Sequence, residues 1–167
     1  MPTFKVTHEI NCNAETFWKT FFEEDFNKKL YTDHLQFPEF KVIEQKETDS
    51  QITRKTAGKP KMSMPGPVAK LLGDNFRYTE EGTFDKATKV FRWKMIPSTL
   101  ADKIKTGGAV RIEPIGDNKV RRIADLEVEA KIFGVGGLME SSAEKQLREG
   151  WDQSAVFMNK YLASAAK

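Results

Sequence analysis

The chain has 167 residues, of which 39% are hydrophobic, 31% charged and 11% aromatic. This length suits one domain with a single core, and the aromatic content excludes an intrinsically disordered chain, so we expect one domain over residues 1–167. Lys and Arg number 27 and Asp and Glu 24, which gives a formal charge of +3. The excess is spread along the chain rather than clustered, and this argues against a nucleic-acid-binding surface.

Cysteine and histidine are scarce. Cys12 is the only cysteine, and His8 and His34 are the only histidines. An internal disulfide and a cysteine-based zinc site are therefore excluded, a histidine-rich metal site is disfavoured, and we expect no metal and no cofactor. The first residues lack the pattern of a secretory signal, and charged residues interrupt every apolar run before it reaches the ~20 residues that cross a bilayer. We expect a cytoplasmic protein.

The first elements are a strand and two short helices. Apolar and polar residues alternate over residues 4–10, which predicts a strand with one buried face. Asn13 has the position and type of a helix N-cap, and the apolar residues of 17–22 that follow it predict a short amphipathic helix. Residues 25–34 have apolar residues at helical spacing and predict a second short helix, which ends before Phe37 and Pro38.

The middle of the chain has the residue pattern of β-strands joined by turns. Residues 58–73 contain prolines and glycines and predict a loop with at most one or two helical turns. Alternating segments joined by turn-forming residues predict six further strands, the first two as a hairpin about residues 48–50. These strands are 39–47, 51–57, 75–86, 89–97, 107–115 and 119–132.

The strongest helical pattern closes the chain, at residues 137–163. Apolar residues recur there every three or four positions from Met139 to Leu162, with charged residues on the other side. Such a long amphipathic helix must lie on an apolar surface. The order of elements therefore predicts an α+β fold, in which a curved antiparallel sheet of six to seven strands wraps around the C-terminal helix. Side chains need not fill so large a concave volume, and the remainder would be a pocket.

Several segments resemble one known superfamily. Residues 133–140 form a glycine-rich turn that leads into the closing helix, with Leu147, residues 150–151 and residues 157–162 along it, and residues 14–18 open the first helix. This pattern resembles the START-like superfamily, which includes birch-pollen-allergen-type proteins, polyketide cyclases and lipid-transfer domains, and it is nearest to the uncharacterised families of that group. The resemblance implies a helix-grip fold and a cavity for a hydrophobic ligand.

Three polar residues interrupt apolar faces and are candidates for orienting a ligand. They are His8, Arg54 and Glu80. His8 shares a face with apolar residues, where a hydrogen-bonded core histidine is the alternative interpretation. An unpaired buried carboxylate would cost several kcal/mol, so Glu80 must find a partner or stay in contact with water. We predict that Arg54, on the adjacent strand, is close enough to pair with it, either as a structural ion pair or as a ligand clamp.

Apolar and aromatic residues are predicted to wall the pocket. Core packing explains the same stripes, but small residues on facing elements favour open space. The predicted wall consists of Tyr78, Phe91, Trp93, Met95, Leu126, Val128, Met139, Ala143, Leu147 and Trp151.

Residues 59–72 mix lysines with apolar residues. The segment could lie on an anionic membrane surface, although an ordinary loop that packs its own apolar residues is the alternative. The predicted contact residues are Lys59, Lys61, Met62, Met64, Leu71 and Leu72.

Catalytic patterns are weak, because no Ser lies in a nucleophile elbow and Cys12 has no activating base near it in sequence. The leading hypothesis is a protein that binds and carries a small hydrophobic molecule, such as a lipid, sterol, isoprenoid or polyketide. One alternative is a cyclase-type or hydratase-type enzyme that uses Glu80 or His8 as acid or base. The other alternative is an interaction module with a filled core.

Overall fold

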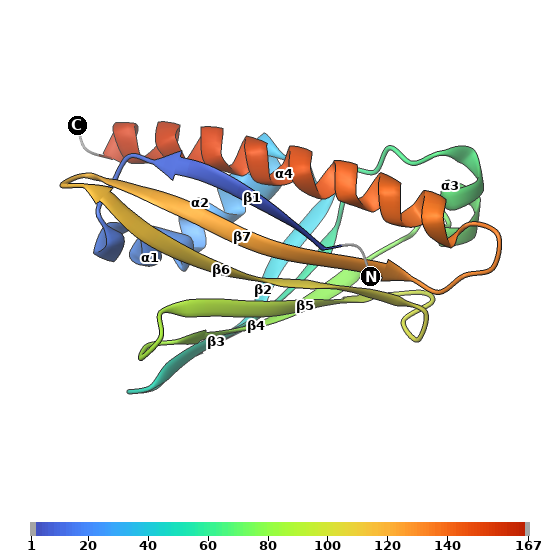
Figure 1. Cartoon of the computed structure of the whole chain (residues 1–167), viewed down its shortest axis with the longest axis horizontal. Helices are drawn as coiled ribbons and strands as arrows, with labels where there is room; N and C mark the ends of the chain where they lie inside the picture. Colours follow the sequence, from blue (N-terminus) through green and yellow to red (C-terminus); the bar gives the residue numbers. More distant parts are fainter. Residues whose placement is uncertain (1–2, 166–167) are drawn as a thin grey trace.

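The computed structural model describes residues 3–165, in which one antiparallel sheet curves around a long C-terminal helix (Figure 1). The elements in chain order are β1 (Thr3–Ile10), α1 (Ala14–Phe21), α2 (Glu24–Lys28), the π-helix η1 (Lys29–His34), β2 (Glu39–Glu47), β3 (Gln51–Lys59), α3 (Gly66–Leu72), β4 (Tyr78–Asp85), β5 (Val90–Pro97), β6 (Ile104–Gly116), β7 (Lys119–Ala130) and α4 (Gly136–Ala165). The prediction of an α+β helix-grip fold is confirmed.

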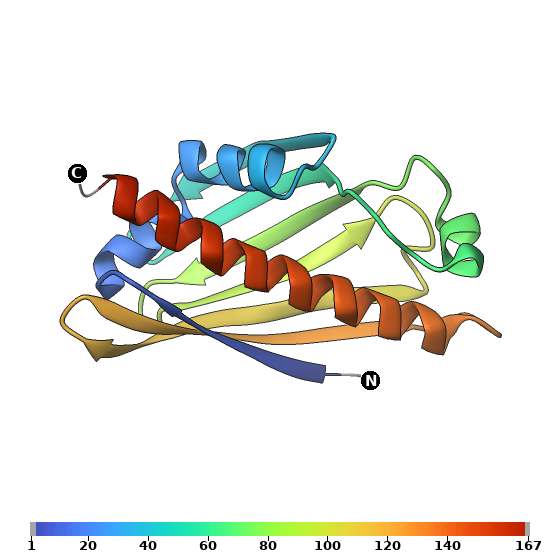
Figure 2. The same cartoon turned by 90° about the horizontal axis from the view of Figure 1, so that it is seen from above.

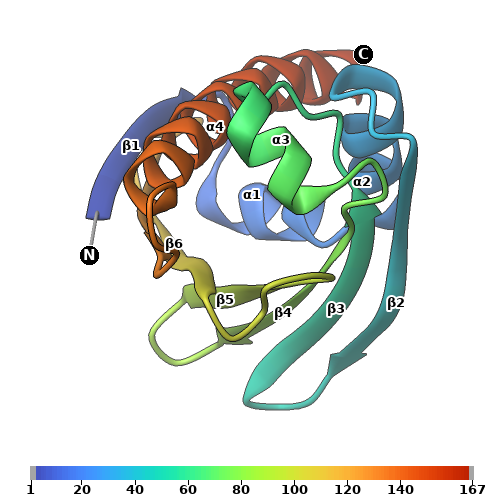
Figure 3. The ribbon, with the colours of Figure 1, turned by 90° about the vertical axis from the view of Figure 1, so that its right-hand side faces the viewer.

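The sheet has the strand order β1-β7-β6-β5-β4-β3-β2, and all neighbouring strands are antiparallel. β1 and β2 follow each other in the chain but form opposite edges, so α1, α2 and η1 carry the chain from one edge to the other. α4 crosses the concave face obliquely (Figure 2). Seen from the end where α3 lies, the strands curve from β1, beside α4, round to β2, and α3 lies at the near end of the fold (Figure 3).

The N-terminal helices are close to those predicted. The Asn13 side chain accepts a hydrogen bond of 2.8 Å from the backbone N–H of Thr16, which confirms the N-cap of α1. The second predicted helix, however, is an α-helix only as far as Lys28. It continues as η1, where the N–H of Leu35 donates to the carbonyl of Leu30, five residues earlier, at 2.8 Å. Such wide turns recur at functional sites.

Two of the predicted strands begin at other residues than expected. The strand predicted over 75–86 begins only at Tyr78, as β4, and the strand predicted over 107–115 already begins at Ile104, as β6. Ile104 and Lys105 pair with Ala130 and Glu129 of β7, and this pairing with a long neighbour extends the strand.

Buried apolar side chains gather at the two ends of the fold. The α1-end cluster is built around Phe17, Trp18, Phe22, Phe84 and Phe91, together with Ala155 and Met158 of α4. The α3-end cluster consists of Val68, Leu72, Phe76, Ala130 and Met139. Close packing in the first cluster depends on Gly82, because a Cβ atom there would lie 2.1 Å from the Phe91 ring. The candidate site lies between these two clusters.

Candidate ligand-binding site

Helix α4 is packed tightly at its ends and less tightly in its middle. Met139 in the first turns and Met158 in the last turns are 3% and 1% exposed. Between them, Ala143, Leu147 and Trp151 point to the same side at helical spacing but are only half-buried. A helix that lay on a solid core would bury its middle at least as deeply as its ends. The middle of α4 is therefore less enclosed by protein than its two ends.

The sheet shows the same feature opposite the middle of α4. Tyr78 and Glu80 of β4 and Trp93 and Met95 of β5 face the concave side and are half-buried. Burial raises the pKa of Tyr78 and of Glu80 above their usual ranges, and for Glu80 it does so against the charge of Arg54. These side chains and the middle of α4 are thus enclosed by protein only in part. We call the region that they surround the central hollow; its residues are Tyr78, Glu80, Trp93, Met95, Ala143, Leu147 and Trp151.

Tyr31 of η1 closes one side of the central hollow. Its ring stacks on Phe40 of β2 with centroids 4.1 Å apart, and Phe37 packs edge-on against both Tyr31 and Tyr78. Burial, followed by the charge of Glu80, raises the pKa of Tyr31. The Tyr78 ring lies over Gly58 of β3, where a Cβ atom would come within 3.0 Å of the Tyr78 hydroxyl oxygen. Sequence reasoning missed Tyr31, because it lies on the apolar side of a predicted helix.

Arg54 corrects one prediction. It lies on the same face of the adjacent strand as Glu80, as expected, but no ion pair joins the two side chains in the described structure. Arg54 Nη1 instead donates to the carbonyl of Phe21, at 3.1 Å. This carbonyl belongs to the last turn of α1, which leaves its acceptors without helical partners, and Arg54 is also stacked against the ring of Phe21 with its Cζ 4.8 Å from the centroid.

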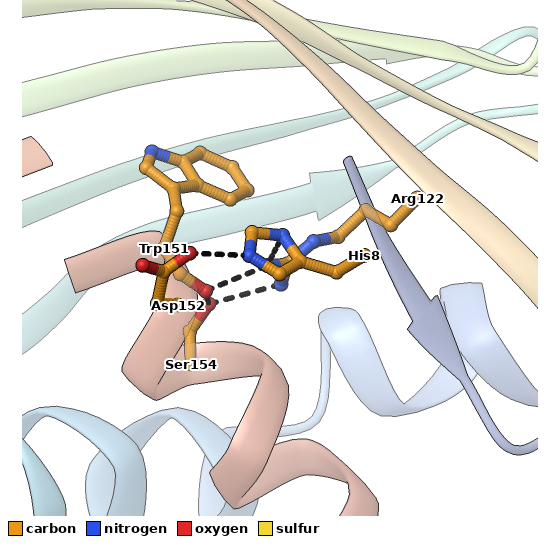
Figure 4. A network of polar contacts seen from close by, with 5 residues as sticks. All are labelled: His8, Arg122, Trp151, Asp152 and Ser154. Atoms are coloured by element: carbon orange, nitrogen blue, oxygen red, sulfur yellow. Dashed lines mark hydrogen bonds and ion pairs between the residues drawn. The ribbon is translucent and has the colours of Figure 1, made fainter. Parts of the chain in front are cut away.

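His8 belongs to a network that joins α4 to the sheet (Figure 4). Arg122 of β7 donates to the Trp151 carbonyl at 2.8 Å, to Ser154 Oγ at 2.9 Å and to His8 Nδ1 at 3.0 Å. Since Nδ1 accepts from a guanidinium, the ring proton of the neutral imidazole is on Nε2, which donates to Asp152 Oδ1 at 2.6 Å. Burial lowers the pKa of Arg122 to about 10.

Both ring nitrogens of His8 are therefore occupied, which leaves neither free to take a proton from a ligand. In this structure His8 positions Arg122, and Arg122 fastens the middle of α4 to β1 and β7. Sequence reasoning missed Arg122, although its position in the strand indicates a buried charged residue. It falls on the inward face of its strand, between Val120 and Ala124, as a charged residue on an apolar face.

Four residues of the predicted wall are covered by protein. Phe91 and Leu126 are 2% exposed in the α1-end cluster, Met139 is in the α3-end cluster, and Val128 is 1% exposed. We assign these four to the packed ends and the sheet core. The other residues of the predicted wall are half-buried, and their role as a pocket wall stays a prediction.

The segment predicted to contact a membrane is divided between core and surface. Leu72 is buried in the α3-end cluster, and Met62 and Met64 are half-buried against it, so Leu72 is not part of an exposed surface. Leu71 is 39% exposed. No helix within residues 3–165 combines the length and apolar character that a membrane span requires.

No curated protein matches the chain. Three similar solved structures cover nearly all of it: the Zhui aromatase/cyclase from Streptomyces sp. R1128 (10% identity, TM-score 0.62, 99% of this chain and 96% of that chain), a START superfamily protein from Mycobacterium smegmatis (16%, 0.57, 98% and 98%) and norcoclaurine synthase from Thalictrum flavum with dopamine and hydroxybenzaldehyde (15%, 0.63, 98% and 87%).

These likenesses, together with the sheet and closing helix, show the START-like helix-grip fold, as the sequence motifs predicted. Within that class, the chain belongs to the family described as "Protein of unknown function (DUF2505)", which matches residues 5–162.

Proposed function

We propose that the chain binds a small hydrophobic molecule in the central hollow. The observation that carries the proposal is the burial pattern of α4, whose ends are packed while Ala143, Leu147 and Trp151 in its middle are half-buried. Trp93 and Met95 supply the facing apolar surface. Each Å² of apolar ligand surface removed from water there would contribute ~25 cal/mol. Hence a lipid, sterol, isoprenoid or polyketide skeleton fits the chemistry of the wall.

The structural neighbours support this class of function. One is named as an aromatase/cyclase, and the norcoclaurine synthase structure holds two small aromatic molecules. Because their sequence identity to this chain is low, these neighbours indicate a shared fold and do not indicate a shared reaction.

An enzymatic role for the same hollow has one specific observation in its favour. Burial holds the pKa of Glu80 above its ordinary range, as a general acid in a cyclase or hydratase would require. His8 lacks a free nitrogen and is not a candidate in this conformation. Turnover that Glu80→Gln abolishes while ligand affinity persists would establish the enzymatic role. Loss of affinity with no turnover in the parent protein would favour a carrier.

The binding proposal is tested with the neutral fluorescent probe N-phenyl-1-naphthylamine and a pair of variants. Ala143→Phe places a ring into the hollow from the middle of α4, and Ala163→Phe places the same ring on an exposed position of the same helix. We expect the parent and Ala163→Phe to bind the probe equally, and Ala143→Phe to bind it at least about tenfold more weakly. No saturable binding by the parent, or equal binding by all three proteins, would favour a filled interaction module.

We also propose a peripheral membrane contact at the α3 end. Phe133, in the turn between β7 and α4, is fully exposed, and Leu71 and Leu138 are 39% and 42% exposed. Exposed lysines flank these side chains, including Lys70 on α3 and Lys131 beside Phe133. Apolar insertion together with attraction to anionic headgroups is the chemistry of an interfacial contact.

Vesicle flotation tests this contact. The parent should float with vesicles of phosphatidylcholine and phosphatidylglycerol at low salt and be released at high salt. Phe133→Ser should reduce flotation several-fold. The control is Val156→Ser, because Val156 is an exposed apolar residue near the other end of α4. Equal flotation of the two variants would rule out the assigned surface.

A further inference from the structure

Three polar side chains converge on one wall of the central hollow. Tyr78 and Glu80 are two residues apart in β4 and so share its concave face, and Tyr31 faces them from η1. The Phe37 ring packs against both tyrosines, with centroids 5.3 Å from Tyr31 and 6.4 Å from Tyr78, which places their rings on the same side of the fold. The charge of Glu80 raises the pKa of both tyrosines, in keeping with this arrangement.

These groups have no hydrogen-bond partners within residues 3–165. The causes that shift the pKa values of Tyr31, Tyr78 and Glu80 are burial and charge, and none is a hydrogen bond. Their oxygens are not among the fully covered unpaired atoms, so they keep accessible surface. Their hydrogen-bonding capacity is therefore open to a molecule in the central hollow.

The neighbouring packing holds the three groups in place. The Tyr31 ring is stacked on Phe40, and the Tyr78 ring is seated over Gly58 and against Phe37. These contacts fix both rings before any ligand arrives, so little conformational entropy is lost when their hydroxyls form hydrogen bonds.

Both nearby cations already donate to backbone carbonyl groups. Arg54 is turned to the Phe21 carbonyl and Arg122 to the Trp151 carbonyl, and the Nε atoms of both are covered by protein. The three converging groups are two phenols and a carboxyl group whose ionisation burial opposes. A carboxylate or phosphate on the ligand would meet Glu80 without a dedicated cation.

We propose that Tyr31, Tyr78 and Glu80 form a neutral hydrogen-bonding subsite that orients the ligand through a hydroxyl or carbonyl group. This inference rests on the proposed function and specifies the chemical class of its ligand, an apolar skeleton with one uncharged oxygen. Two hydrogen bonds in such a site amount to about tenfold in affinity.

The test uses displacement of N-phenyl-1-naphthylamine by 2-methylnaphthalene, 2-naphthol, 2-acetylnaphthalene and 2-naphthoate. The parent should bind 2-naphthol and 2-acetylnaphthalene about tenfold more tightly than 2-methylnaphthalene, and 2-naphthoate most weakly. In the double variant Tyr31→Phe/Tyr78→Phe, which keeps both rings, this preference should shrink to about twofold. The affinity for 2-methylnaphthalene should stay nearly unchanged.

The outcomes separate the two proposals. If all four compounds displace the probe with equal affinity, if the preference survives in the double variant, or if 2-naphthoate binds most tightly, the subsite is refuted while the binding function stands. If neither the probe nor any naphthalene binds, the binding function fails and the subsite fails with it.

Discussion

Two similar truncations in α4, Met158→Ala and Leu147→Ala, should lower the free energy of unfolding by different amounts, because only Leu147 lies over the central hollow. Met158→Ala removes a side chain that is 1% exposed in the α1-end cluster. It should lower the free energy of unfolding by ~3 kcal/mol, because transfer free energy is lost and a new cavity forms. Leu147→Ala removes a side chain of similar size that is half-buried over the hollow. It loses fewer contacts and enlarges a space that already exists, so its cost should be ~1 kcal/mol.

Urea denaturation with linear extrapolation measures both costs, and thermal unfolding repeats the comparison. At ~2–4 °C per kcal/mol for a chain of this size, Met158→Ala should lower Tm by ~6–12 °C and Leu147→Ala by ~2–4 °C. The urea m-values should not change, since both variants keep the fold. Equal costs above ~3 kcal/mol would mean that Leu147 is packed as tightly as Met158, and would refute the reasoning.

Three further substitutions test the local physics. Burial raises the pKa of Glu80, so the folded state holds the proton more tightly and stability falls as pH rises above the ordinary glutamate value of about 4.3. Glu80→Gln should therefore stabilise the protein at pH 7 relative to its effect at pH 4, and a difference in unfolding free energy that does not vary with pH would contradict this. Arg122→Lys keeps the charge but loses the forked donors to His8, Trp151 and Ser154, and should cost ~2 kcal/mol by urea denaturation; a cost under ~0.5 kcal/mol would show that the network does not fasten α4. Asn13→Ala should cost ~1 kcal/mol in the same assay, and no loss would mean that the cap of α1 is dispensable.

Most of the fold could be predicted because its elements have clear periods. Alternation of residues defined the strands, and a spacing of three to four residues defined α4. Asn13 marked the start of α1 by its side-chain chemistry. The π-helical turn of η1 could not be predicted in this way, because the same apolar spacing also fits an α-helix over residues 25–34.

The site was harder to predict, because the tertiary structure decides which hydrogen-bond partner each polar side chain meets. Alternation placed Arg54 and Glu80 on one face, but only the folded chain brings the Phe21 carbonyl to Arg54. In the same way, sequence patterns cannot distinguish a residue that fills the core from one that borders a space. Met139 and Leu147 fit the same helical stripe, yet one is buried and the other half-buried.

A crystal structure of the protein under xenon pressure tests the central claim most directly, since xenon occupies apolar cavities. The account predicts xenon density beneath the middle of α4, in contact with Trp93, Met95 and Leu147. Side chains packed solidly across that region, with no xenon between the two hydrophobic clusters, would contradict it.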